Sequence, residues 1–429
     1  MSAVRHLIHL SRGRWFRRLF AVRLASQLTD GFFQVALTSY VIFSPERAPT
    51  PGAIAAALAV VLLPFSVLGP FVGVFLDRWS RRQVLAWSNF VRIAMMLALA
   101  LSVYADWHGL ALFAQILLAL SVNRFLLAGL SAALPHVVDE ADLVTANALT
   151  PTSGTLAFLV GLGLGTGARA VIDGAGGNGD VGVLLGAAVL YAAAGFLALR
   201  IPRDMLGPDL DELRPVMREA VRHVARGLVD GLRHLGERRP AAYALAAIGA
   251  HRFFYGISTV SLILLYRNYF HDGTDVDAAF NQLAFAVLVS GAGFVAAAVL
   301  TPIVTERVTL RTWVLVLLAS AAVTQAFPAS LYTEPGLLVA AFFLGLASQG
   351  IKICVDTVVQ MSLEDAYRGR VFALYDVIFN VAFVAAAAAS AVVLPANGKS
   401  YAVLAVISAG YLATAAGYAA ATRRLVPVP

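Results

Sequence analysis

Residues 73–82 of the chain read GVFLDRWSRR, and long apolar runs flank this stretch on both sides. Four charged side chains, Asp77, Arg78, Arg81 and Arg82, lie within six residues of one another. A polar connection this short between two runs of membrane-spanning length predicts a tight turn between two transmembrane helices. Arginines on such a turn favour its placement on the inner face of the membrane.

The composition of the chain also indicates a membrane protein. Of its 429 residues 59% are hydrophobic and 13% are charged, whereas a soluble domain carries about 25% charged residues. Basic residues outnumber acidic ones by 32 to 25. A basic excess can indicate nucleic-acid binding, but its placement is better explained by membrane topology. The single Cys354 excludes a disulfide framework and a cysteine-based metal cluster, and we expect no metal, no cofactor and no nucleic-acid partner.

Twelve apolar segments are long enough to cross a bilayer as helices. We therefore predict an all-α integral membrane protein with an N-terminal six-helix bundle (1–200), a cytoplasmic linker (201–239) and a C-terminal six-helix bundle (240–429). Apolar residues at helical spacing in the linker predict an amphipathic helix on the inner membrane face. The predicted spans are 19–43, 53–76, 83–105, 109–134, 147–172, 181–200, 241–266, 278–303, 312–330, 335–358, 371–394 and 400–422.

The arginines fix the expected orientation of these spans. With the N-terminus inside, the cytoplasmic segments hold 23 arginines, whereas the outer loops hold only three basic residues, Arg47, Arg267 and Lys399. Cytoplasmic segments of membrane proteins carry the excess of basic residues. We therefore expect both termini in the cytoplasm.

The two predicted halves resemble each other. QLTDGFFQVALTSYVI (27–42) is similar to IGAHRFFYGISTVSLI (248–263), and DEADLVTANAL (139–149) is similar to EDAYRGRVFAL (364–374). The two matches have nearly the same offset, which indicates a duplicated six-helix unit. Internal repeats of this kind are typical of secondary transporters, whose binding site lies near the middle of the bilayer.

Over essentially its whole length the chain resembles the major facilitator superfamily. GVFLDRWSRR matches the family's signature between helices 2 and 3 at Gly73, Asp77, Arg78, Arg81 and Arg82, with Ser80 in place of a glycine. The segments LVTANAL (143–149) and EDAYRGRVFAL (364–374) resemble the branch of macrolide-efflux proteins and the enterobactin exporter. This resemblance implies export across a bacterial inner membrane.

The resemblance also implies a conformational gate. Asp77 and Arg78 are expected to contact the start of helix 11, near Arg370, when the cytoplasmic side is closed. We further expect Arg81 and Arg82 to pair with the acidic segment 139–142. The residues expected in this gate are Gly73, Asp77, Arg78, Arg81, Arg82, Asp139 and Arg370.

Several ionisable residues fall inside the predicted spans, where each unpaired charge is costly. The deepest are Asp30, Arg92, Arg124, Arg252 and Lys352. Two interpretations remain open: a static salt-bridge network between helices, or the lining of a central aqueous cavity.

In the cavity interpretation Asp30 carries the coupling proton, since it is the only deep acid of the first span. Arg92, Arg124 or Lys352 would then attract an anionic substrate group or modulate the proton site. Asp376 is predicted only about one turn inside its helix.

Aromatic side chains are expected to form walls of the same cavity. Phe33, Phe254 and Tyr255 suit a bulky amphipathic substrate, although ordinary helix packing explains them equally well. His251, the counterpart of Asp30 in the second half, is either a packed side chain or a proton shuttle. GLGLGTGA (161–168) resembles a nucleotide-binding loop, but its apolar context predicts close packing of helices through small residues.

We predict a secondary active transporter, and not an enzyme, that exports an amphipathic small molecule such as a drug or siderophore in exchange for protons. It would act as a monomer in the lipid bilayer. One alternative is translocation of lysophospholipid or another lipid. Another is a membrane sensor that keeps a transporter fold without transporting.

Overall fold

In the computed structural model, residues 9–37 (except Ser11), 50–59, 62, 79–107, 110–207, 224–271 and 276–423 are described. Within these residues every regular element is a helix. The long helices are α2 (Arg14–Leu37), α4 (Arg81–Tyr104), α5 (Leu110–Ala133), α6 (Leu143–Gly174), α7 (Gly179–Leu199), α9 (Val224–Glu237), α10 (Arg239–Leu264), α11 (Val276–Thr305), α12 (Leu310–Ala326), α13 (Glu334–Ser362), α14 (Asp365–Val393) and α15 (Tyr401–Thr422).

Ten of these helices are long and apolar enough to cross a membrane. They coincide with ten of the twelve predicted spans. The predicted first span corresponds to α2, which begins at Arg14 and is described as far as Leu37. Of the predicted second span, 53–76, only residues 53–59 and 62 lie within the described part, and these are helical. The connecting segment contains α9, within the predicted linker.

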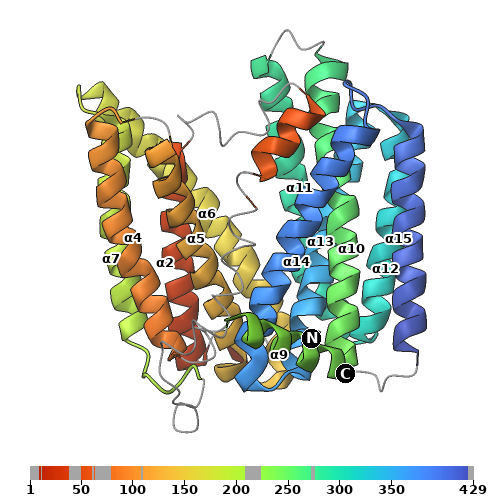
Figure 1. Cartoon of the computed structure of the whole chain (residues 1–429), viewed down its shortest axis with the longest axis horizontal. Coiled ribbons are helices and arrows are strands. Elements are labelled where there is room, and N and C mark those ends of the chain that lie inside the picture. The colour runs from red at the N-terminus through yellow and green to blue at the C-terminus, as the bar shows by residue number, and fades with distance from the viewer. Residues whose placement is uncertain are drawn as a thin grey trace.

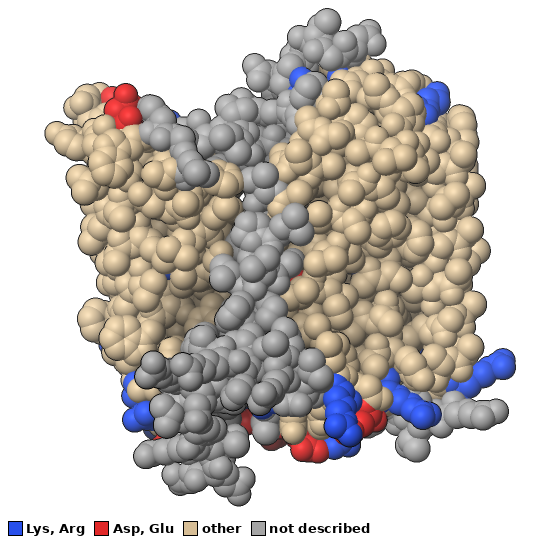
Figure 2. All heavy atoms as spheres, in the orientation of Figure 1, with Lys and Arg blue, Asp and Glu red and all other residues tan. Residues whose placement is uncertain are grey.

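The helices form two bundles (Figure 1). One consists of α2 and α4–α7, the other of α10–α15. The bundles meet at the end where α2 begins and α15 ends, and they diverge toward the opposite end. We call the end where they meet the closed end. On the face shown in Figure 2, the described residues between the two ends carry almost no charge and charged residues gather at the ends, as an apolar bilayer core requires.

Glycines bring helices into close contact within each bundle. In the N-terminal bundle a Cβ on Gly161 of α6 would lie 1.9 Å from the carbonyl oxygen of Leu28, on α2. In the C-terminal bundle a Cβ on Gly345 of α13 would lie 2.2 Å from the carbonyl oxygen of Ser290, on α11. Within residues 161–168, Gly161 and Gly165 pack closely against α2 as expected, whereas an added Cβ on Gly163 or Gly167 meets open space.

The α2–α6 contact makes a stability prediction with an internal control. Gly161→Ala pushes the backbones of α2 and α6 apart, and we expect this overpacking to destabilise the protein by about 1–3 kcal/mol. Gly163→Ala lies on the same helix, where an added Cβ meets open space, so both variants share the helix-propensity gain of alanine. Thermal unfolding of purified protein should give a lower midpoint for Gly161→Ala, and equal midpoints would contradict the close contact.

Candidate functional site

Arg81 joins the two bundles at their closed end. Its side chain is fully buried at the start of α4. Nη1 lies 3.1 Å from the carbonyl oxygen of Ala132 on α5 and 3.1 Å from that of Leu206, in the segment after α7 that packs on the N-terminal bundle. The same nitrogen donates to Asp365 Oδ1 at 2.9 Å, and Nη2 donates to the Asp365 carbonyl oxygen at 3.3 Å. One guanidinium therefore ties the N-terminal half to the first residue of α14.

Two more side chains complete this contact. His136 Nε2 lies 2.8 Å from Asp365 Oδ1 and 2.7 Å from Arg81 Nη1, so its tautomer decides whether it donates to the carboxylate or accepts from the guanidinium. Arg368 donates to the same carboxylate oxygen at 2.9 Å. We call Arg81, His136, Asp365 and Arg368 the latch.

The carboxylate of the latch is held in its charged form. Burial alone would raise the pKa of Asp365, but the hydrogen bond with His136 and the charge of Arg81 hold that pKa well below its usual range. The carboxylate also lies at the N-terminus of α14, where the helix dipole favours negative charge. Asp365 is therefore ionised at every physiological pH.

A neutral hydrogen-bond cluster lies beside the latch. Asn147 of α6 donates to Gln360 Oε1 at 2.6 Å and to Thr357 Oγ1 at 3.1 Å, both on α13. Gln360 in turn donates to the carbonyl oxygen of Ser131 at 3.1 Å. These buried groups satisfy one another across the two halves, so the closed end is sealed by matched polar contacts.

The latch differs in detail from the gate expected from the sequence. Gly73, Asp77 and Arg78 lie outside the described residues. Arg81 contacts Asp365 instead of the acidic segment 139–142. Arg82 donates to the carbonyl oxygen of Ile201 at 3.0 Å.

Two further members of the expected gate lie near the latch without joining it. Asp139 is exposed and lies in a group with His9 and Asp142 whose ligand atoms are all within 4.8 Å; His9 Nδ1 is 2.7 Å from Asp142 Oδ2. Exposed acidic groups of this kind are no evidence of a metal. The Arg370 guanidinium lies over the ring of Tyr367, 4.8 Å from its centre.

Asp30 and Arg92 form a buried ion pair inside the N-terminal bundle. Arg92 Nη1 donates to Asp30 Oδ1 at 2.5 Å, and the Tyr191 hydroxyl donates to the same oxygen at 2.7 Å. Arg92 also donates to Asn89 Oδ1 at 3.0 Å and lies 4.2 Å from the centre of the Tyr191 ring. The predicted proton site and its nearest arginine are thus brought together, with α2, α4 and α7 each supplying one side chain.

A second set of deep charges lies between the halves. Lys352 Nζ is 2.5 Å from Asp356 Oδ2, one turn later on α13. Arg124 of α5 interacts electrostatically with Asp376 of α14 and with Arg252 of α10. Asp376 is eleven residues from the start of α14, so its predicted position one turn inside the helix is wrong. The helix begins at Asp365, six residues before the apolar run on which the prediction was based.

Arg252 is held by aromatic rings. Its guanidinium lies 4.1 Å from the centre of Phe379 and 4.3 Å from that of Phe383, both on α14, and 5.4 Å from that of Tyr255. Among the described residues it has no hydrogen-bonded or ion-paired carboxylate, and its Nε is buried without a hydrogen bond. Arg252 is therefore a cation stabilised by ring faces alone.

The predicted aromatic walls separate into packing residues and one cavity residue. Phe33 is buried in the core of the N-terminal bundle. Phe254 packs against Tyr411 and Gly410 of α15. His251 is buried near the rings of Tyr255 and Tyr411, and neither ring nitrogen has a partner in the described part of the chain.

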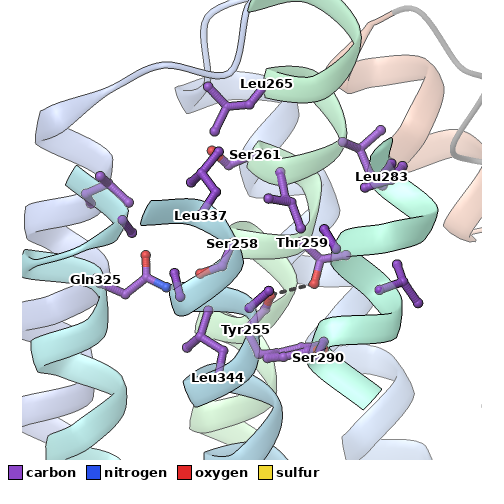
Figure 3. Close-up of a pocket in the computed structure, with 18 of the residues that line it drawn as sticks. Tyr255, Ser258, Thr259, Ser261, Leu265, Leu283, Ser290, Gln325, Leu337 and Leu344 are labelled. Atoms are coloured by element: carbon purple, nitrogen blue, oxygen red, sulfur yellow. Dashed lines mark hydrogen bonds between the residues drawn. The ribbon is translucent and has the colours of Figure 1, made fainter. Parts of the chain in front are cut away.

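Tyr255 lines a cavity inside the C-terminal bundle (Figure 3). The cavity has a volume of about 180 Å³ and lies among α10, α11, α12 and α13. Leucine and other apolar side chains supply most of its wall, and the buried Gln325 of α12 contributes an amide. The sequence did not indicate this cavity, because its lining residues are distributed over helices that are distant in the chain.

The latch makes a prediction about conformational balance. Asp365→Asn removes the charge that Arg81, His136 and Arg368 share, so the closed end should open more often. The measurement is modification of Ser131→Cys, in a Cys354→Ala background, by a membrane-impermeant maleimide, and the expected change is a severalfold faster reaction. Because the pKa of Asp365 is depressed, the carboxylate stays charged and stabilises the closed end at every pH above its ordinary pKa. The rate of maleimide modification, measured without the Asp365→Asn substitution, should therefore show no step from this carboxyl between about pH 5 and 8.

Glu364→Gln is the matched control for the latch. Glu364 neighbours Asp365 in sequence but pairs with the exposed Arg238 of its own half, and exposed pairs contribute little. An Asp365→Asn rate equal to that of Glu364→Gln would show that the latch does not hold the closed end.

Comparison with known proteins identifies the family of this chain. The model of the Major Facilitator Superfamily matches residues 19–387. Two relatives, each named an uncharacterized MFS-type transporter, come from Mycobacterium bovis and Mycobacterium tuberculosis. Each is 35% identical over 416 residues, which cover 96% of this chain and 92% of the relative.

Solved structures show the same fold. A bacterial homologue of the iron transporter ferroportin, in an outward-facing state, matches with a TM-score of 0.67 at 16% identity, over 95% of this chain and 99% of that chain. The proton:xylose symporter XylE matches with a TM-score of 0.65 at 12% identity, over 96% of both chains. The predicted all-α fold, with twelve transmembrane helices in two six-helix bundles, is confirmed. This chain belongs to the major facilitator superfamily and is a membrane transporter.

Proposed function

We propose that this transporter exports an amphipathic small molecule across the bacterial inner membrane in exchange for protons. The distribution of arginines favours a cytoplasmic position for both termini. The closed end is then the cytoplasmic end, and the present conformation faces outward, as required for substrate release by an exporter. The resemblance of residues 143–149 and 364–374 to efflux proteins supports the direction of transport.

The observation that carries this proposal is that charged side chains and an apolar cavity lie in different parts of the protein. Arg124, Asp376 and Lys352 place charges at the boundary between the bundles, while a largely apolar cavity lies within the C-terminal bundle. A molecule with a polar and an apolar part matches this division. The same observation favours lipid translocation as a second candidate, since a lysophospholipid has the same two parts.

Asp30 is our candidate for the coupling proton site. A buried carboxylate can be neutralised without stranding its partner only when that partner has other contacts. Arg92 has such contacts in Asn89 and in the ring of Tyr191. Protonation of Asp30 therefore weakens the ion pair while the guanidinium keeps hydrogen-bonded and aromatic neighbours, which allows the proton to be taken up and released during the cycle.

The proton role is tested with Asp30→Asn in proteoliposomes. We expect flux to lose its dependence on an imposed pH gradient, because the amide cannot exchange a proton. Asp356→Asn is the matched control, since Asp356 is also a buried carboxylate in an ion pair; it should retain the pH dependence even where its rate is lower.

The static-network interpretation gives the opposite outcome for Asp30→Asn. Thermal unfolding would then report a large loss of stability, since breaking a buried pair costs roughly 3–5 kcal/mol. Flux by the surviving folded protein would keep the wild-type pH dependence, and that result would exclude Asp30 as the coupling site.

A further inference from the structure

The cavity in the C-terminal bundle has an apolar wall with few polar groups. Leu262 of α10, Leu283 of α11, and Leu337 and Leu344 of α13 line it, and its lining contains no charged side chain. Val287 of α11, which is more than half exposed, lies at the cavity wall and marks its open side. Such a wall fits the uncharged, apolar body of a ligand.

Gln325 is the one amide among the polar residues that the structure shows in this wall. Its side chain is 2% exposed, and the described residues include no hydrogen-bond partner for its amide. Figure 3 shows it extending from α12 toward the other lining side chains. Its amide faces the cavity, so a ligand atom there can hydrogen-bond it.

Two hydroxyl groups of the wall are available to a ligand as hydrogen-bond acceptors. Ser258 and Thr259 donate to backbone carbonyls one turn earlier, at 3.0 and 2.9 Å. Their protons are therefore already used, and their oxygens offer acceptor positions to the cavity. The Gln325 amide adds both a donor and an acceptor to this wall.

Tyr255 connects the cavity to Arg252, which is not itself a lining residue. Tyr255 lines the cavity and also lies beside the guanidinium, whose carbon is 5.4 Å from its ring centre. Among the described residues Arg252 is held on ring faces; its Nε is buried, so its two terminal nitrogens are the groups left to donate hydrogen bonds. Lys352 differs, because Asp356 compensates its charge at 2.5 Å. Arg252 is thus a cation without a carboxylate partner in the described residues, and the ring of Tyr255 separates it from the apolar cavity.

We propose that Arg252 and this cavity form a binding site for an amphipathic organic anion, with the acidic group on the guanidinium and the apolar body in the cavity near Gln325. This inference rests on the proposed function and narrows its substrate class from amphipathic molecules to amphipathic acids. Charge-assisted hydrogen bonds to the guanidinium would fix the acidic group. Contact with the leucine wall would fix the body.

The test uses two photoactivatable probes on the full-length protein in lipid nanodiscs. One is dodecanoate with a diazirine in its chain, and the other has the same chain with a trimethylammonium group in place of the carboxylate. Mass spectrometry then locates the modified residues. We expect the carboxylate probe to modify cavity-lining residues of α10, α12 and α13, and to do so at least tenfold more than the ammonium probe.

Variants assign the parts of the site. Arg252→Gln should remove the preference for the carboxylate probe, Gln325→Leu should lower the modification severalfold, and Ala340→Phe should abolish it by filling the cavity. Leu288→Phe is the matched control, since Leu288 is exposed on α11 next to the cavity residue Val287.

The comparison of the two probes on the wild-type protein tests whether the cavity binds amphipathic anions, even if a variant fails to fold. Modification spread over the lipid-exposed residues, or equal for both probes, would overturn the proposal. Specific modification of the cavity in a protein without flux would retain the site and reject the proposed export. Proton-coupled flux of a neutral or cationic substrate without cavity modification would retain transport and reject the site.

Discussion

The buried guanidinium of Arg81 is the contact on which the arrangement of the two halves depends. It is fully enclosed and reaches the carbonyl oxygens of Ala132 and Leu206 as well as the carboxylate of Asp365 in the other half. Such a charge is tolerable only when these partners are all in place. Separation of the closed end must therefore expose or re-pair Arg81. This requirement makes the contact suitable for a two-state switch, because intermediate positions would leave a buried charge unsatisfied.

The two bundles share a helix pattern but differ in how they treat charge. In the N-terminal bundle Asp30, Arg92 and Tyr191 satisfy one another. In the C-terminal bundle Arg252 lies on aromatic rings, one of which lines an apolar cavity. Each half thus contains an ion pair, Asp30–Arg92 in one and Lys352–Asp356 in the other, and the C-terminal half has in addition a cation held on aromatic rings. This asymmetry supports separate sites for proton and substrate.

The sequence predicted the fold well because hydropathy and arginine placement act locally along each span. It also predicted that small residues within 161–168 serve packing. It did not predict that Arg81 meets Asp365, since the two are 284 residues apart and only tertiary packing brings them together. Nor did it show which face each aromatic presents: Phe33 is buried in its own bundle, whereas Tyr255 lines a cavity. In a helix without a clear polar face, packing against neighbouring helices decides which side chains face a bundle core and which face a cavity.

The most direct test of the central claim is a double-mutant cycle between Arg81 and Asp365. The population of the closed conformation is measured by electron–electron distances between spin labels on the two halves, in wild type, Arg81→Gln, Asp365→Asn and the double variant. If the two side chains hold the closed end together, the double variant should open no further than the single ones, with a coupling of about 1–3 kcal/mol. Additive effects of the two substitutions would contradict the account.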